Sequence, residues 1–82
     1  MSTDKLQTVS LKEAAAIAGL ASETLARQRV ARGVWEHVVI TGEVRIPLSC
    51  LKQHYPGAVE YWQAMDVLAK AKYVKQNVRA GV

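Results

Sequence analysis

A group of polar and basic side chains is concentrated between residues 22 and 32. Its members are Ser22, Glu23, Thr24, Arg27, Gln28, Arg29 and Arg32. Arginine donates a bidentate pair of hydrogen bonds to guanine and glutamine pairs similarly with adenine, so Arg27 and Gln28 are candidates for contacts with base edges. Ser22 and Thr24 come first, and hydroxyl groups at the start of a helix suit phosphate groups. The alternative is that the whole set forms the solvated face of a packed helix.

Two short helices are predicted to position this group. Ser10 and Glu13 fit a capping box that begins a helix over residues 11–18. Ser22 can cap a second helix over residues 23–32, and a glycine follows each helix, where positive φ is needed. Two short helices joined by a turn form the helix-turn-helix pattern, in which the second helix enters the major groove of DNA. The spacing therefore predicts a DNA-binding unit.

A β-hairpin is predicted after these helices. Two β-branched runs, residues 38–40 and 44–46, flank Thr41-Gly42-Glu43, and a glycine at this place favours a turn. Such a hairpin would form a wing beside the DNA. The tip is not basic, and Glu43 would repel phosphate, so Arg45 on the second strand is the better candidate for a DNA contact. The alternative is that the hairpin only covers the core.

The rest of the chain is predicted to be helical and to complete a small α+β winged helix-turn-helix. A short helix covers residues 50–55, and a longer C-terminal helix covers residues 56–76. Its apolar stripe consists of Val59, Trp62, Met65 and Ala69, broadened by Tyr61, Leu68 and Tyr73. Asp66 and Lys70 are spaced for a favourable ion pair on this helix.

This pattern predicts four parts of the chain. Residues 1–8 form a flexible lead, residues 9–55 the DNA-binding domain, residues 56–76 a helix that packs on it or mediates self-assembly, and residues 77–82 a frayed tail. A basic stripe of Lys72, Lys75 and Arg79 near the end could grip phosphate or a neighbouring protomer, although a solvated surface is the favoured interpretation.

The bulk composition restricts the class of protein. The chain has 82 residues, enough for one domain with one small core. Lys and Arg outnumber Asp and Glu by 11 to 7, and the net charge of +4 favours a polyanionic partner such as nucleic acid. Cys50 is the only cysteine, which favours a cytoplasmic protein without disulfides. No apolar run of about 18 residues occurs, so no membrane association is expected.

Other chemistries lack the residues that they need. Cys50 and His54 have the spacing of metal ligands on a helix, but only His37 remains as a further candidate, so no metal or other cofactor is expected. No nucleophile has a local histidine with an acidic partner, and no glycine-rich phosphate loop is present, so the chain is not expected to be an enzyme. The aromatic residues Trp35, Trp62, Tyr55 and Tyr61 are interpreted as core rather than as a stacking platform.

The order of elements resembles the excisionase-type winged helix-turn-helix family, a relative of the MerR group. The residues that carry this resemblance are Val9-Ser10-Leu11-Lys12-Glu13-Ala14-Ala15, then Gly19-Leu20-Ala21-Ser22-Glu23-Thr24-Leu25 with Arg27 and Gly33, then Val44-Arg45-Ile46-Pro47 and the helix from Ser49 to His54. A protein of this size with an extra C-terminal helix is similar to the Cox-type excisionases and repressors of temperate phages.

The resemblance implies a role at DNA inside a bacterial host, in association with the nucleoid. It implies cooperative binding of double-stranded DNA at short direct repeats, with self-association on the DNA, bending of an attachment site, and a phage integrase as partner. The same binding would repress a promoter. Thr24, Arg27 and Gln28 inherit the recognition role, and Arg45 the wing role. Gln28 and Arg29 stand where the family commonly has apolar residues, so the sequence leaves the rotation of this helix open.

Two other functions stay open. One is a simple dimeric repressor or MerR-like regulator that pairs through the last helix. The other is a protein-interaction adaptor on a winged-helix scaffold, because a fold does not fix a function.

Overall fold

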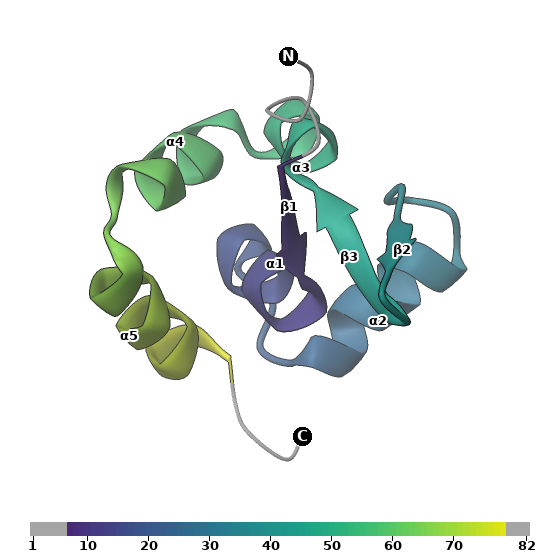
Figure 1. Ribbon diagram of the computed structural model, residues 1–82, viewed down its shortest axis with the longest axis horizontal. Helices are drawn as coiled ribbons and strands as arrows, with labels where there is room; N and C mark the ends of the chain where they lie inside the picture. Colours follow the sequence, from purple (N-terminus) through teal and green to yellow (C-terminus); the bar gives the residue numbers. More distant parts are fainter. Residues whose placement is uncertain (1–6, 79–82) are drawn as a thin grey trace.

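Residues 7–78, which the computed structural model describes, form three strands and five helices (Figure 1). In chain order these are β1 (Thr8–Ser10), α1 (Leu11–Ala18), α2 (Glu23–Ala31), β2 (Val38–Ile40), β3 (Glu43–Pro47), α3 (Leu48–His54), α4 (Pro56–Ala64) and α5 (Val67–Asn77). The expected α+β class is confirmed.

The three strands form one antiparallel sheet in the order β1-β3-β2. β1 is not among the predicted elements, because the sequence predicts a flexible lead over residues 1–8 and a domain that begins at residue 9. A three-residue strand has almost no local signal, and its conformation depends on pairing with β3, where Val9 lies opposite Ile46. Thr8 therefore belongs to the sheet, and residues 1–6 lie outside the described residues.

The β2–β3 hairpin is tighter than expected. Ile40 pairs with Glu43, so only Thr41 and Gly42 remain in the turn, and Glu43 belongs to β3. Both turn residues have positive φ, 54° and 79°, as the type I′ hairpin turn requires. Gly42 adopts this conformation freely, whereas a β-branched residue such as Thr41 is strained there.

The alanine-rich helix α1 lies at the centre, with α4 and α5 on one side of it and β3, β2 and α2 on the other (Figure 1). Ala14, Ala15 and Ala16 have no exposed surface, and α1 contacts every other helix as well as β1 and β3. Small side chains allow this close approach from several directions. The core around them is completed by larger side chains, of which Trp35, Ile46, Leu51 and Val59 are the largest that are fully buried.

The expected single C-terminal helix over residues 56–76 is wrong, because it is divided into α4 and α5. Met65 has extended backbone angles, and the Asp66 side chain accepts the backbone N–H of Ala69 at 2.8 Å as the N-cap of α5. The apolar spacing of Val59, Trp62 and Met65 continues into α5 and conceals the break. Asp66 is consequently a cap and forms no ion pair with Lys70 among the described residues.

The last described residues are ordered by the core. α5 ends at Asn77, and Val78 is only 5% exposed. The expected frayed tail from residue 77 is therefore wrong for residues 77 and 78, and residues 79–82, with Arg79, lie outside the described residues. Within residues 7–78 every helix is too short or too polar to cross a membrane. α3 begins at Leu48, two residues earlier than the expected start at Cys50, directly after Pro47.

Candidate nucleic-acid interface

Helix α2 is fixed at both ends by local hydrogen bonds. The Ser22 hydroxyl accepts the backbone N–H of Leu25 at 3.4 Å, and Ser22 is only 3% exposed. At the other end Gly33 has a φ of 77°, and its N–H donates to the carbonyl of Val30 at 3.0 Å. The Ser22 hydroxyl thus serves as a buried N-cap, and it is not presented at the surface as a phosphate ligand.

The burial of one alanine settles the rotation of α2. Ala26 has no exposed surface, which places it at the centre of the face that packs towards α1. With 3.6 residues per turn, Thr24 and Gln28 then lie on the opposite face, and Arg32, the C-cap, lies between this face and the edge at Leu25; all three are exposed. Of the residues expected to recognise bases, Thr24 and Gln28 therefore have the most outward positions.

Arg27 lies at one edge of this outward face and is held by an acidic neighbour. Its Nη2 atom is 2.7 Å from Oε2 of Glu23, one turn earlier on the helix. The side chains are 60% and 38% exposed, and an exposed pair with this spacing contributes only about 0.3–0.5 kcal/mol. The ion pair can thus orient the guanidinium group and still give way to a stronger partner.

Leu25 lies at the other edge and was not among the expected site residues. It is 39% exposed, although leucine is usually buried. An apolar side chain on such a face suits the methyl group of thymine. The sequence predicts that Leu25 is exposed only if Ala26 is already known to be the core position of α2.

Arg29 belongs to the junction that follows α2. Its side chain is half-buried, and its carbonyl oxygen accepts the N–H groups of Val34 at 2.9 Å and Trp35 at 3.3 Å. Trp35 itself is 2% exposed and has an edge contact with Tyr55 at 6.4 Å between ring centroids. Arg29 therefore lies beside the packed region rather than in the outward stripe of α2.

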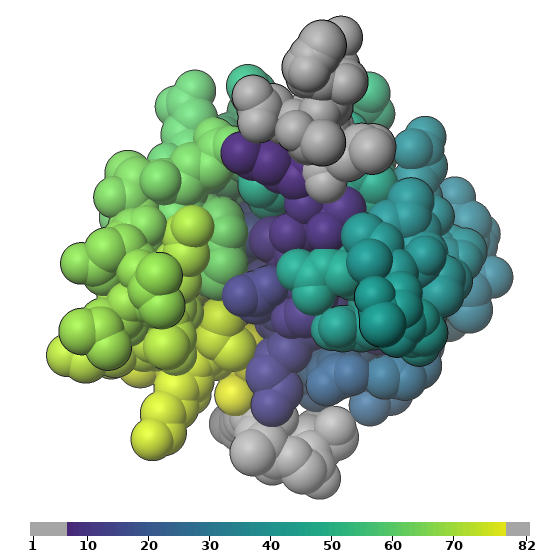
Figure 2. All heavy atoms as spheres, viewed as in Figure 1, coloured from purple at the N-terminus to yellow at the C-terminus, as the bar shows by residue number. Residues whose placement is uncertain are grey.

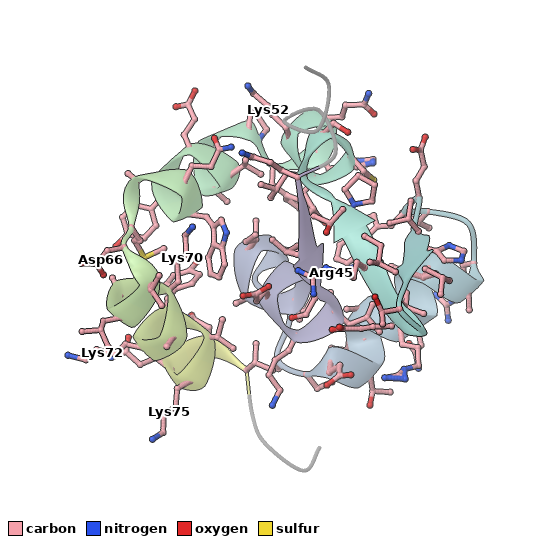
Figure 3. The ribbon with its side chains drawn as sticks, in the orientation of Figure 1. Arg45, Lys52, Asp66, Lys70, Lys72 and Lys75 are labelled. Carbon is pink, nitrogen blue, oxygen red and sulfur yellow. The ribbon has the colours of Figure 1, made fainter. Side chains whose placement is uncertain are left out.

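Arg45 is bound to the edge of the sheet (Figure 3). Its Nε atom donates to Oγ1 of Thr8 at 2.8 Å, Nη2 donates to the Thr8 carbonyl at 3.3 Å, and Nη1 is 3.3 Å from Oε2 of Glu43. In an antiparallel pair of strands, hydrogen-bonded and non-hydrogen-bonded residue pairs alternate. Leu48 donates to the Gln7 carbonyl at 2.9 Å, so the next pair, Thr8 with Pro47, is not hydrogen-bonded, and Pro47 has no N–H in any case. The Thr8 carbonyl is therefore directed away from β3. Arg45 thus covers a polar group on the free edge of β1.

The hairpin beside α2 presents apolar and acidic side chains. Val39 is 62% exposed, Ile40 is 45% exposed, and the side chain of Glu43 is 56% exposed. No basic residue lies in the turn of Thr41 and Gly42. The structure therefore offers no cation at the hairpin tip for a phosphate group.

The predicted lysines of α5 are separated from α2. Lys72 and Lys75 point outward from α5, on the opposite side of α1 (Figure 3). Trp35 and Trp62 are buried, as expected, whereas Tyr61 is 61% exposed. In the part of the chain that the structure describes, no group of three or more metal-ligating side chains is gathered.

The outward face of α2 is thus the place where the predicted polar residues come together. It combines Thr24, Gln28 and Arg32 with Arg27 and Leu25 at its edges, on a helix with two fixed ends. Arg45 is held apart from it by its contacts with Thr8. Compared with known proteins, the chain matches no protein-family profile, no curated protein and no solved structure.

Proposed function

We propose that this protein binds double-stranded DNA in a sequence-specific manner, with α2 in the major groove. The observation that carries the proposal is the outward stripe of α2, in which Gln28 stands between Thr24 and Arg32 directly opposite the buried Ala26. A helix with its side chains is about 10–12 Å wide, which matches a major groove about 12 Å wide. Arg27, Arg29 and Arg32 outnumber Glu23 on this helix, which favours attraction to phosphate.

We assign different tasks to the members of this surface. Gln28 suits adenine, Arg27 suits guanine once it leaves Glu23, and Leu25 suits the thymine methyl group. Arg32, at the C-cap of α2, suits a phosphate group. The hairpin would help to position the protein on DNA but would supply no positive charge, since its exposed side chains are apolar or acidic.

The resemblance to excisionase-type proteins supports a more specific role, which is part of the proposal. Several copies would bind adjacent repeats, bend the duplex, and thereby place an integrase or exclude a polymerase from a promoter. Smooth bending of a site of roughly 20–30 bp costs on the order of 1–6 kcal/mol. A domain that enters the major groove with a single short helix makes few contacts per copy, so this cost favours assembly of several copies.

A second candidate function is that of a simple dimeric regulator. It is favoured by an apolar surface on α5, where Val67 is 82% exposed and Leu68 is 73% exposed. A two-fold contact through this surface would give a stable dimer without DNA. Analytical ultracentrifugation of the free protein separates the two functions, because the architectural role requires a monomer that assembles only on its DNA.

Selection of binding sequences from a random duplex pool, followed by affinity measurements in increasing salt, tests the proposed function. We expect one enriched sequence and a log–log salt slope near −0.9 for each phosphate neutralised, with about four to six phosphates per copy. A pool without enrichment would contradict sequence-specific binding. An affinity that does not change between low and moderate salt would contradict DNA binding as a whole.

A further inference from the structure

A groove runs between the β1–α1 side of the molecule and the α4–α5 side (Figure 2). It consists of two hollows with volumes of about 390 Å³ and 490 Å³, and Glu13 and Lys70 line both of them. The first hollow lies beside β1, Trp62 and Gln63, and the second lies between the start of α1 and α5. Because they share these two residues, we treat them as one surface, the α1–α5 groove.

Cations exceed acids along this groove. Lys12, Lys70 and Arg45 line it, and Glu13 is the only acid among the lining residues, although Arg45 also pairs with Glu43 outside the groove, so Lys12 and Lys70 carry the excess of positive charge. One oxygen of the Glu13 carboxylate already accepts the backbone N–H of Ser10 at 2.9 Å. The groove is therefore complementary to a negatively charged ligand.

Lys70 is the cation best placed to receive such a ligand. Its Nζ atom lies 5.4 Å from the centroid of the Trp62 ring, towards the groove, whereas Lys72 and Lys75 point away from it (Figure 3). The acid expected to pair with Lys70 was Asp66, but that carboxylate caps α5. Among the described residues Lys70 has no ion-pair partner.

The second hollow is apolar apart from its rim. Val67, Ala71 and Val74 form its α5 wall, and Val67 is 82% exposed. A phosphate backbone gains nothing from such a wall, whereas an aliphatic side chain is removed from water there. The combination of an apolar wall with a cationic rim favours a protein segment over a nucleic acid.

We propose that the α1–α5 groove docks a segment of another protein in which aliphatic side chains alternate with aspartate or glutamate. The aliphatic side chains would lie against Val67 and Ala71, and a carboxylate would reach Lys70. The segment would be held by side chains and not as a fourth strand, because Arg45 already binds the Thr8 carbonyl and Glu13 already binds the Ser10 N–H at the free edge of β1.

This surface is separate from the face proposed to bind DNA. α1 lies between the groove and α2, so both surfaces are accessible at the same time (Figure 1). A copy bound to DNA through α2 would therefore display a docking site for an acidic partner. Docking in the groove does not require DNA, so it can be tested first in the absence of DNA.

The test uses a fluorescently labelled peptide of about ten residues in which leucine alternates with glutamate and aspartate. Its binding to the full chain is measured by fluorescence anisotropy at an ionic strength of about 0.15 M. A peptide with lysine at the acidic positions is the first control. Lys70→Glu and Val67→Asp are compared with Lys72→Glu and Leu68→Asp, which make the same changes on α5 outside the groove.

We expect the acidic peptide to bind, the lysine peptide not to bind, and Lys70→Glu and Val67→Asp each to weaken binding about tenfold or more. The two control variants should bind as the unaltered chain does. Equal binding by Lys70→Glu and Lys72→Glu, or no binding of the acidic peptide, would overturn the proposal.

In a second arm with labelled duplex DNA, a loss of DNA binding caused by Lys70→Glu but not by Lys72→Glu would assign the groove to nucleic acid instead. A change in self-association in the two groove variants alone, without peptide binding, would assign it to a second copy of this chain.

Discussion

Arg27 and Arg45 carry the same guanidinium group, but their neighbours give them different roles. Arg27 has one exposed partner, Glu23, on its own helix. Arg45 donates to two atoms of Thr8 on a neighbouring strand and also contacts Glu43, and its side chain is only 26% exposed. A weakly held arginine could change partners in the proposed complex with DNA, whereas Arg45 would have to give up contacts that hold β1 to the sheet.

Replacement of Arg27 by alanine should remove recognition of one base pair. We expect a loss of about 1–3 kcal/mol on the selected sequence and a much smaller loss on scrambled DNA, because a bidentate contact with guanine has no equivalent there. Gel-shift titrations on both duplexes measure the difference, with Lys72→Ala as a matched loss of charge away from α2. An equal loss on both duplexes would show that Arg27 contacts phosphate.

Replacement of Arg45 by methionine should act mainly on stability. The two hydrogen bonds to Thr8 are partly buried, so their loss should cost about 1–2 kcal/mol of the free energy of unfolding. Urea denaturation provides the measurement, and Thr8→Val, which removes only the hydroxyl contact, should show a smaller decrease. Unchanged stability together with weaker DNA binding would instead support the wing role that the family resemblance implies.

At the scale of helices and strands, the sequence predicts best where the signal is local. The capping box of Ser10 and Glu13 is present, with the Glu13 N–H bound to the Ser10 hydroxyl at 3.1 Å, and α1 ends at Gly19 as expected. These bonds join residues three or four positions apart. The hairpin was also predictable from β-branched runs, although the pairing of Ile40 with Glu43 that fixes its turn was not.

The elements that escaped prediction depend on distant contacts or on an ambiguous residue. β1 exists because Val9 meets Ile46, and nothing within residues 8–10 indicates that partner. Asp66 is compatible with two structures: an ion pair within one long helix, or an N-cap at the start of a second helix. The packing of α5 against α1 selects the N-cap. The outward face of α2 could be predicted as a set, but its rotation required the burial of Ala26.

The joint between α4 and α5 should depend on Trp62. This side chain is 3% exposed, has an edge contact with Tyr73 of α5 at 6.2 Å between centroids, and lies beneath Lys70. We expect Trp62→Ala to reduce the free energy of unfolding by about 3–5 kcal/mol, because it empties a large core site. Tyr61→Ala, on the same helix but 61% exposed, is the control for chemical denaturation and should have a clearly smaller effect. Equal midpoints for the two variants would contradict this role of Trp62.

At the scale of the whole molecule, two pairs of adjacent exposed apolar residues mark two separate surfaces. One is on the hairpin, where Val39 and Ile40 are exposed, and the other is on α5, where Val67 lines the α1–α5 groove and Leu68, outside the groove, is the residue proposed to face a neighbouring copy. The two surfaces lie on opposite sides of α1 (Figure 1). A contact that joins the hairpin of one copy to α5 of the next is heterologous, and such contacts extend in one direction instead of closing into a dimer.

This arrangement predicts cooperative binding to DNA with repeated sites. DNA holds neighbouring copies at a high effective concentration, so a contact too weak to form in solution becomes occupied on the template. Per-site affinity should therefore rise from one repeat to two and to three in anisotropy titrations, while the free protein remains monomeric. Leu68→Asp should abolish the rise without changing affinity for a single site, because Leu68 is exposed on α5, on the other side of α1 from α2 (Figure 1). Val39→Asp should also abolish the rise, and its affinity for a single site is measured separately, because an added carboxylate on the hairpin would lie near phosphate in the proposed complex.

A mixture of the two variants distinguishes a heterologous contact from a two-fold one. On DNA with two repeats, a copy carrying Val39→Asp retains its α5 surface, and a copy carrying Leu68→Asp retains its hairpin surface. In one of the two possible orders on the DNA these intact surfaces meet, so an equal mixture should recover part of the cooperativity that either variant alone lacks. Neither a two-fold contact between hairpins nor one between α5 helices could be restored in this way, because each mixed pair would contain one altered copy of the surface. Equal per-site affinity of the unaltered protein on DNA with one, two and three repeats would refute templated assembly and would favour the simple dimeric regulator as the function.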